Sequence, residues 1–240
     1  MSIILLFVYN PATMKLSVII PVYNEVESIK VILKRVINTK LAGEIVVVDD
    51  GSADGTREVL KKMDGRNGVR VLLHERNQGK GAAVRTGITA AKGDVLLIQD
   101  ADLEYDPRDI PALLKPIKER IADVVYGSRF LGGAHRVTMF WHMVANRMLT
   151  FMTNILYNTI LTDMETGYKV FRREVIEGMV IRSNSFDFEP EFTAKILKRN
   201  YRIFEVPITF NPRDYTQGKK IKLHDAFEAV WTLLKYRLVD

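Results

Sequence analysis

Short apolar runs alternate with amphipathic segments through the first half of this 240-residue chain. The runs have the length of buried strands, and the segments between them carry apolar residues at helical spacing, such as Ile29, Ile32, Leu33 and Val36. This alternation predicts an α/β, Rossmann-like architecture, in which helices cover both faces of a parallel sheet. We expect strands at Leu16–Ile20, Ile45–Val48, Val69–Leu73, Val95–Ile98 and Val124–Tyr126, and helices at Glu27–Asn38, Thr56–Met63, Lys80–Ala91 and Pro111–Arg120.

The pattern changes after Gly127. A long, mostly apolar helical segment is expected at Thr138–Leu161 and an amphipathic helix at Leu223–Leu238. Between them, Tyr168–Phe171 and Ile203–Phe210 predict two strands with a helix near Glu189–Arg199. We find no internal repeat or linker, so this half is expected to complete the same sheet.

Composition narrows the class of protein and of partner. The chain is 47% hydrophobic and 27% charged, which is ordinary for a globular protein. It contains no cysteine, which excludes disulfides and thiolate metal sites. A net charge of +6 suits an anionic partner such as a nucleotide, a phosphate or an acidic membrane surface. No long block of one charge sign occurs, so we expect no nucleic-acid partner.

The first thirteen residues are expected to form an N-terminal extension. The apolar run Ile3–Val8 is too short to span a bilayer and lacks the basic leading region of a signal peptide. Met14 directly precedes the first strong strand and is a candidate start. No other segment reaches the ~18 apolar residues of a transmembrane helix. The absence of cysteine leaves the compartment open, with the cytoplasm as the default.

Two aspartates follow the apolar run Val95–Ile98, with one residue between them. Residues two apart on an extended backbone point the same way, so the carboxylates of Asp100 and Asp102 should face one spot beyond the strand. Ligands of an open parallel sheet bind at that edge. With Glu104 nearby, the oxygen donors favour a hard divalent cation, Mg²⁺ or Mn²⁺, over a plain solvated loop. Asp106 is not expected to bind the cation, because its simpler role is to cap the helix that starts at Pro107.

Polar clusters also end two other expected strands. Pro21–Glu25 (PVYNE) follows the first strand, and Asp49–Ser52 (DDGS) follows the second. Because both lie at the carboxyl ends of parallel strands, they should share an edge with the aspartate pair. Tyr23 offers an aromatic face and Asp50 an acceptor for base or ribose donors. Each cluster alone has a plain explanation as core or turn, but their common location describes a nucleotide diphosphate site.

The glycine loop Asn77–Gly81 opens an expected helix. Backbone amides at a helix start attract phosphate. However, the glycine spacing of a Walker loop and its Ser/Thr after the lysine are missing. A tight strand-to-helix turn is therefore the favoured role.

The motifs taken in order resemble a known family. Along the chain stand PVYNE, DDGSADGT, NQGKGAAVRTG, DADLEYDP, GSRF, TDMETGYKVFRREV and EVPITF, then Arg213 and Gly218-Lys219-Lys220. Together they look like an inverting glycosyltransferase of family 2, close to the dolichyl-phosphate mannose synthase group of polyprenyl-phosphate glycosyltransferases. The resemblance covers residues 14–238 and implies one glycosyltransferase A-type domain over 14–240. Its nucleotide-sugar-binding half would be 14–127, and its acceptor half 128–240.

The resemblance implies roles at the donor. The positions that hold base and ribose are matched by Pro21, Tyr23, Glu25, Val48 and Asp50. The positions of the sugar-nucleotide and metal site are matched by Asp100, Ala101 and Asp102. Glu104 stands where the archaeal mannose synthases often carry glutamine, and it keeps an oxygen ligand while adding charge.

The resemblance also implies roles nearer the acceptor. The basic positions around the diphosphate and the acceptor phosphate are matched by Arg129, Arg136, Arg213 and Lys220. Asp163 precedes the turn Thr166-Gly167-Tyr168, as an aspartate does in the family, although Met164-Glu165 replaces the common Pro-Thr. The expected catalytic set is therefore Asp102, Arg129, Asp163 and Arg213.

The implied reaction is metal-dependent, inverting hexose transfer from a GDP-mannose or UDP-glucose type donor to a dolichyl or undecaprenyl phosphate. A phosphate acceptor is already a nucleophile, so catalysis is mostly positioning and charge stabilisation. One alternative is a saccharide acceptor in cell-surface polysaccharide synthesis, which needs a base such as Asp163 or Glu165. Another is a non-catalytic nucleotide-sugar-binding subunit, against which the full set of acids and arginines argues.

Two expected helices bear on membrane contact. Thr138–Leu161 carries Trp141 and Arg147 among apolar residues, and Leu223–Leu238 carries Trp231 and Lys235. Aromatic and basic residues on an apolar helix suit the headgroup region, although helices packed in a core show similar periodicity. With the implied lipid phosphate, they favour peripheral binding at the cytoplasmic face of the membrane, directly or through a membrane partner subunit.

Overall fold

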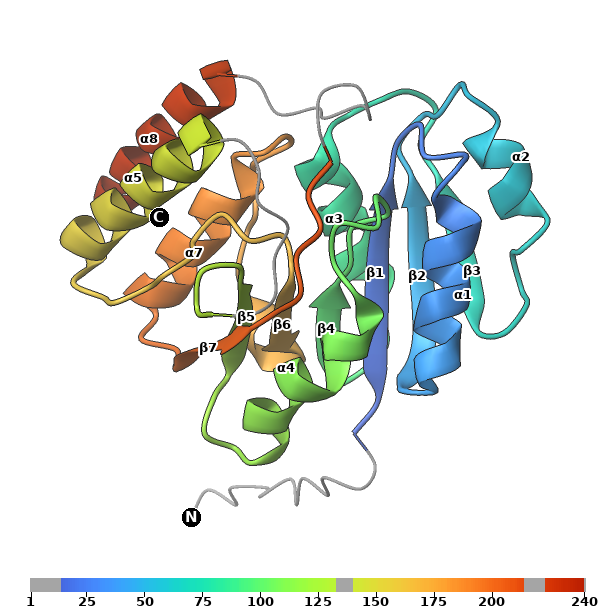
Figure 1. Cartoon of the computed structure of the whole chain (residues 1–240), viewed down its shortest axis with the longest axis horizontal. Coiled ribbons are helices and arrows are strands. Elements are labelled where there is room, and N and C mark those ends of the chain that lie inside the picture. The colour runs from blue at the N-terminus through green and yellow to red at the C-terminus, as the bar shows by residue number, and fades with distance from the viewer. Residues whose placement is uncertain (1–13, 133–139, 214–222, 240) are drawn as a thin grey trace, which may run out of the picture.

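The computed structural model describes residues 14–132, 140–213 and 223–239, which form one seven-stranded sheet between two layers of helices (Figure 1). The strands are β1 (Leu16–Val22), β2 (Ala42–Asp49), β3 (Val69–Leu73), β4 (Val95–Ile98), β5 (Val124–Ser128), β6 (Lys169–Arg172) and β7 (Ile203–Pro207). The helices are α1 (Ile29–Thr39), α2 (Thr56–Lys61), α3 (Lys80–Ala90), α4 (Ile110–Lys118), α5 (Phe140–Tyr157), α6 (Arg173–Ile176), α7 (Phe188–Lys198) and α8 (Leu223–Leu238), with the 3-10 turn η2 (Pro107–Asp109) before α4.

The sheet has the strand order β3-β2-β1-β4-β6-β5-β7. β1 pairs in parallel with β2 and β4, β2 with β3, and β5 with β7, whereas β6 runs antiparallel to both of its neighbours. The prediction of an α/β fold with a mostly parallel sheet is thereby confirmed. The parallel pairing also brings the carboxyl ends of β1, β2 and β4 to one edge.

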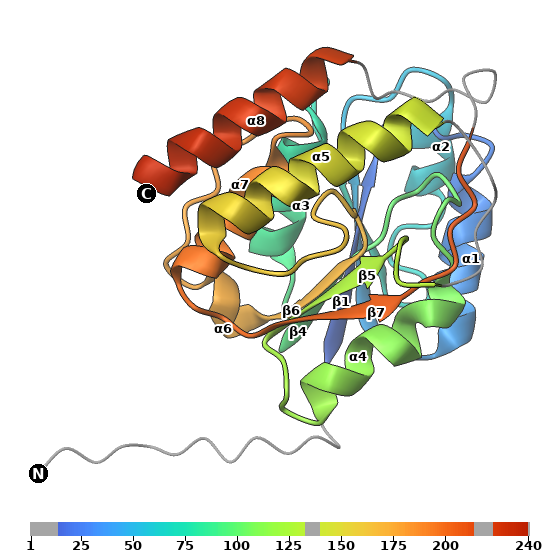
Figure 2. The same ribbon diagram turned by 60° about the vertical axis from the view of Figure 1, so that its left-hand side comes forward.

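Each face of the sheet has its own apolar core. Helices α1, α2 and α4 pack on one face, and α3, α5, α7 and α8 pack on the other (Figures 1 and 2). Neighbouring side chains of β1 alternate between the cores, since Val18 and Ile20 belong to the first and Ile19 to the second. Because both faces are covered, the central strands are apolar throughout, which explains why their runs were readable in the sequence.

One local prediction is wrong, and one short helix was not predicted. The strand expected through Phe210 ends at Pro207, because its partner β5 ends at Ser128, which is paired with Pro207. The chain then runs beside the residues that follow β4, where Phe210 forms a bridge with Tyr105. The short helix α6 was not expected, because four residues are too few to show helical periodicity.

Several expectations lie at or beyond the limits of the described residues. The predicted extension 1–13 lies outside them, and the helix expected from Thr138 is described from Phe140 onward. Within the described ranges, no helix is long and apolar enough to cross a membrane.

We expect Leu33→Ala to lower the free energy of unfolding by about 2–5 kcal/mol, because Leu33 is fully buried between α1 and the sheet. Val31→Ala on the same helix should cost no more than about 0.5 kcal/mol, because Val31 is exposed. Urea unfolding of both variants measures the difference. Equal losses at the two positions would contradict the assigned face of α1.

Candidate active site

Three acidic residues meet Arg213 beyond the carboxyl ends of β1 and β4. The Arg213 guanidinium donates to Glu25 Oε1 (2.9 Å) and Oε2 (3.1 Å), and its Nη2 lies 3.3 Å from Asp102 Oδ2. The backbone N–H of Arg213 donates to Glu104 Oε1 (2.8 Å). Burial opposes the Arg213 charge, but these carboxylates raise its pKa. A cation from residue 213 therefore lies within the acidic cluster of the first half.

The Asp102 carboxyl is crowded by other acids. Burial raises its pKa to about 7, and the neighbouring carboxylates of Asp100 and Glu104 add to the shift. The Arg213 charge and the Glu104 N–H, which donates to Asp102 Oδ1 at 3.1 Å, act in the opposite direction. Any further cation that reached this position would relieve the repulsion between the acids.

Asp100 is held by Lys80, the first residue of α3. Lys80 Nζ lies 3.0 Å from Asp100 Oδ1 and 2.9 Å from Glu189 Oε1 in α7. Although burial opposes the Lys80 charge, these two carboxylates raise its pKa well above the ordinary value. A Cβ at Gly167 would collide with Asp100 Oδ2, so a larger residue there would force the Asp100 carboxylate to move.

The glycine loop itself forms the tight turn that was expected. Gly79 has φ +99°, and a Cβ there would collide with the Asn184 backbone. The Lys80 side chain, next in the sequence, contacts Asp100. In the described residues, the loop does not have the form of a Walker phosphate-binding loop.

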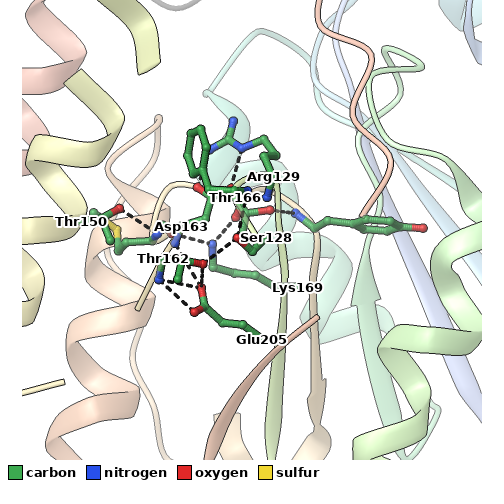
Figure 3. A network of polar contacts seen from close by, with 12 residues as sticks. Ser128, Arg129, Thr150, Thr162, Asp163, Thr166, Lys169 and Glu205 are labelled. Carbon is green, nitrogen blue, oxygen red and sulfur yellow. Dashed lines mark hydrogen bonds and ion pairs between the residues drawn. The ribbon is translucent and has the colours of Figure 1, made fainter. Parts of the chain in front are cut away.

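Arg129 and Asp163 form a closed pair beside this cluster (Figure 3). Asp163 is fully buried and accepts from Arg129 Nε and Nη2, at 2.7 Å each, and from the Arg129 backbone N–H at 3.0 Å. Burial opposes the guanidinium charge, yet Asp163 raises the Arg129 pKa far above its usual range. The Phe210 ring lies 5.2 Å from the guanidinium carbon.

The residues predicted to bind base and ribose lie at the ends of β1 and β2. Pro21 and Val48 are register partners, and Tyr23 beyond them is 36% exposed. Asp50 is buried, and its carboxylate accepts from Gln78 N (3.0 Å) and Gly79 N (2.8 Å) and contacts His74 Nδ1 (2.7 Å). Asp50 thus anchors the glycine loop in this structure, and its contact with a nucleoside stays a prediction.

The structure brings most, but not all, of the predicted residues together. The acids that follow β1 and β4 meet Arg213, and Arg129 meets Asp163. Ala101 is buried between the aspartates, so its side chain faces the core. Arg136 and Lys220 lie outside the described residues. Asp106 caps η2 as expected, accepting from Arg108 N at 2.9 Å.

Four charged residues of the site were missed by sequence reasoning: Lys169 and Glu189, which are buried, and Lys80 and Glu205, which are half-buried. The partners of Lys80, Glu189 and Glu205 lie far away in the chain, so local spacing gave no sign of those contacts, whereas Lys169 bonds to carbonyls only three and five residues before it. Lys80, within the glycine loop, and Glu205, within EVPITF, did fall inside quoted motifs. A charged residue inside an otherwise apolar or glycine-rich motif was the available signal.

The donor set at the end of β4 fits a hard divalent cation in its chemistry. It offers carboxylate oxygens, from Asp100, Asp102 and Glu104, and burial together with the charges of the other two acids raises the Asp102 pKa. In the described ranges, however, no three acidic or histidine side chains are arranged around one metal position. Asp100 is directed to Lys80 and Asp102 to Arg213. The three-ligand assignment therefore stays a prediction.

Comparison with known proteins decides the family. Residues 17–179 match the family described as Glycosyl transferase family 2. This chain belongs to that family. It is 34% identical over 212 residues to the dolichol-phosphate mannosyltransferase of Pyrococcus furiosus, covering 86% of this chain and 59% of the relative. It is 27% identical to the dodecaprenyl-phosphate galacturonate synthase of Rhizobium johnstonii, covering 86% and 62%. The chain thus spans about three fifths of these two relatives.

An uncharacterized protein of Methanocaldococcus jannaschii matches along more of its length. It is 30% identical, with 92% of this chain and 91% of the relative covered. Among solved structures, glucosyl-3-phosphoglycerate synthase from Mycobacterium tuberculosis, with Mn²⁺, UDP-glucose and phosphoglyceric acid, superposes with a TM-score of 0.76. It is 20% identical, with 95% of this chain and 82% of that one covered. This likeness confirms the predicted glycosyltransferase A-type fold.

We expect Asp102→Asn to stabilise the protein in the absence of divalent cations, increasingly so as pH rises. The folded-state pKa of Asp102, about 7, lies above its ordinary value of 3.8, so the folded state keeps a proton that the unfolded state releases. Ionisation of Asp102 therefore costs stability as pH rises from about 4 through about 7. Asparagine carries no such cost. Urea unfolding in EDTA across this range measures the difference between the two proteins.

Asp54→Asn is the matched control with the opposite sign. Although burial opposes it, hydrogen bonds from Thr56 lower the pKa of Asp54, so its ionised form stabilises the fold and is lost as pH falls. Its substitution should cost more at neutral than at acidic pH. A pH-independent effect of Asp102→Asn would contradict the crowding of the acids.

Proposed function

We propose that this protein transfers a hexosyl group from a nucleotide diphosphate sugar to a polyprenyl phosphate, with a divalent cation at the Asp100–Asp102 pair. One observation carries the proposal: Arg213, from the second half of the chain, contacts Glu25 and Asp102 at the carboxyl ends of β1 and β4. A cation suited to an acceptor phosphate therefore lies beside the expected nucleotide-sugar site. Two relatives named for polyprenyl-phosphate products support the acceptor class.

The state of the nearby acids favours an acceptor that is already ionised. Both oxygens of Asp163 are bonded to Arg129, so this carboxylate is not available as a base. Burial and the charge of Glu189 raise the pKa of Glu165 to about 8, so Glu165 holds its proton at neutral pH. A saccharide hydroxyl needs a base to remove its proton, whereas a phosphate monoester does not.

Three groups of residues would have different roles in such a transfer. The cation, held by Asp100 and Asp102 and aided by Glu104, would supply charge neutralisation for the leaving diphosphate. Tyr23, Glu25 and the ends of β1 and β2 would hold the nucleoside. Arg129 and Arg213 would stabilise phosphate charge and align the acceptor for in-line attack.

The outer surface of α5 and α8 suits a bilayer surface. The two helices lie side by side (Figure 2), and the Tyr157 hydroxyl donates to the Leu233 carbonyl at 2.8 Å. Each carries a stripe of exposed apolar side chains at helical spacing: Trp141, Val144, Met148, Phe151 and Ile155 on α5, and Phe227, Trp231, Leu234 and Leu238 on α8. We propose that this surface, called the α5–α8 face, lies on the cytoplasmic side of the membrane.

A transfer assay tests the reaction. The protein is incubated with Mn²⁺, a short polyprenyl phosphate and labelled GDP-mannose or UDP-glucose in parallel. We expect label in the organic phase with one donor, and its loss on chelation, because the carboxylates need a cation to hold a diphosphate. Transfer to a glycan instead would favour the saccharide alternative. Binding without turnover would favour the non-catalytic subunit.

Variants tie the assay to the site. Asp102→Asn should lower turnover by about 100-fold or more, because it removes one charge from the cation site. Arg213→Ala should reduce turnover more than nucleotide affinity, because the arginine faces phosphate charge that develops during transfer. Arg108→Ala is the matched control, since this arginine is 85% exposed and its ion pair is with Asp106, outside the acidic cluster that contacts Arg213.

We expect the protein to sediment with vesicles that contain anionic lipid, and less so at high salt, because exposed charges are screened. The double change Phe151→Glu with Trp231→Glu should weaken sedimentation by about tenfold, because it places charge on the α5–α8 face. Ile121→Glu, an exposed apolar position after α4, serves as control. Protein that stays in the supernatant even with polyprenyl phosphate present would point to a membrane partner subunit or a soluble acceptor.

A further inference from the structure

Glu205 in β7 accepts hydrogen bonds from a turn some forty residues earlier in the chain (Figure 3). Its Oε1 accepts from Thr162 N (3.0 Å), Thr162 Oγ1 (3.1 Å) and Asp163 N (3.1 Å), and its Oε2 accepts from Thr162 N (2.9 Å). One carboxylate thus satisfies three donors of the turn.

The same turn is held from its other side by a buried cation. Lys169 in β6 is fully buried, and its Nζ donates to the Met164 carbonyl (3.0 Å) and to the Thr166 carbonyl. Two strand residues of opposite charge therefore fix the backbone of the turn, one at its N–H groups and one at its carbonyls. The turn has little freedom to shift relative to the sheet.

The fixed turn carries Asp163, and Asp163 orients Arg129. The carboxylate engages Nε and Nη2 at 2.7 Å each, a two-point contact that sets the plane of the guanidinium. Among residues 14–132, 140–213 and 223–239, nothing accepts a hydrogen bond from Nη1 of Arg129. One edge of the guanidinium is committed to Asp163, and the other is left for an anion.

We propose that Glu205 is a positioning residue for Arg129, acting through the turn and Asp163. The inference rests on the proposed function, in which Arg129 stabilises phosphate charge. The two carboxylates, Glu205 and Asp163, repel each other. The N–H groups of the turn and the Arg129 guanidinium offset that repulsion. Without the Glu205 carboxylate, the N–H groups of Thr162 and Asp163 lose their acceptor, and the Asp163 side chain can rotate away from Arg129.

The kinetic test compares Glu205→Ala, Glu205→Gln and Glu44→Ala. Glu205→Ala should lower kcat by about tenfold or more while KM for the donor changes less than about threefold. Glutamine keeps the one oxygen that three contacts use, so it should rescue kcat to within about threefold. Glu44 performs a similar structural task at the opposite edge of the sheet, accepting from Ser17 Oγ (2.6 Å) and the Lys92 N–H. Glu44→Ala should therefore lower the stability of the protein without lowering kcat relative to KM for the donor.

A double-mutant cycle separates positioning from general scaffolding. If Glu205 acts through Arg129, Glu205→Ala should cost less than about twofold in kcat once Arg129→Ala is present. Losses that multiply would overturn the proposal. Should Glu205→Ala not fold, Glu205→Asp, whose shorter side chain cannot reach both N–H groups, enters the same cycle with the same expectation.

A measurement without turnover keeps this inference distinct from the proposed function. The Nε–H proton of Arg129, bonded to Asp163, should exchange slowly with water and disappear from the NMR spectrum in Arg129→Lys. Glu205→Ala should speed its exchange by about tenfold, whereas Glu205→Gln and Glu44→Ala should not. Unchanged exchange in Glu205→Ala overturns the positioning role. If the wild type transfers no sugar yet the exchange pattern appears, the proposed function fails and the positioning stands.

Discussion

Four carboxylates at the carboxyl edge of this sheet, some buried and some half-buried, are each paired with a cation from another segment of the chain. Lys80 from the start of α3 reaches Asp100, Arg213 from beyond β7 reaches Glu25 and Asp102, and Arg129 after β5 is bonded to Asp163. An unpaired charge at these positions would carry a large desolvation cost. The arrangement of the segments around the edge depends on these pairs, because removing either member leaves an uncompensated charge.

The pairs also account for the chemistry that the site can perform. Burial raises the pKa of Asp102, and the charges of Asp100 and Glu104 add to that shift, so a further cation near the acids after β4 would favour their ionised forms. Among the described residues, Nη1 of Arg129 and Nε of Arg213 have no hydrogen-bond acceptor. A polyanionic donor that arrives with a divalent cation would satisfy both the acids and these N–H groups at once, which is a reason to expect cation and nucleotide sugar to bind cooperatively.

The sequence supported prediction wherever the controlling contacts are local. Val95–Ile98 followed by Asp100 and Asp102 is recognisable because strand periodicity and acid spacing are properties of neighbouring residues. Arg213 and Glu25 are in contact although they lie 188 residues apart in the sequence, and Glu205 and Thr162 are hydrogen-bonded at a separation of 43 residues. No local sequence pattern predicts either contact. The end of β7 depended on where β5 stops, so its length was misjudged. The resemblance to the family identified Arg129 and Asp163 as site residues, but it did not indicate that Lys169 and Glu205 hold the turn that carries Asp163.

The place of β6 in the sheet has a consequence for how the chain folds during synthesis. β4 pairs with β1 on one side, but its other side is completed only by β6, whose Val170 is the register partner of Leu97. Until the ribosome has delivered that later strand, the nascent chain presents β4 as an open apolar edge, the kind that templates unwanted pairing. Such non-local closure raises contact order and slows folding. Chaperone dependence should therefore be greatest for chains that end between α4 and β6.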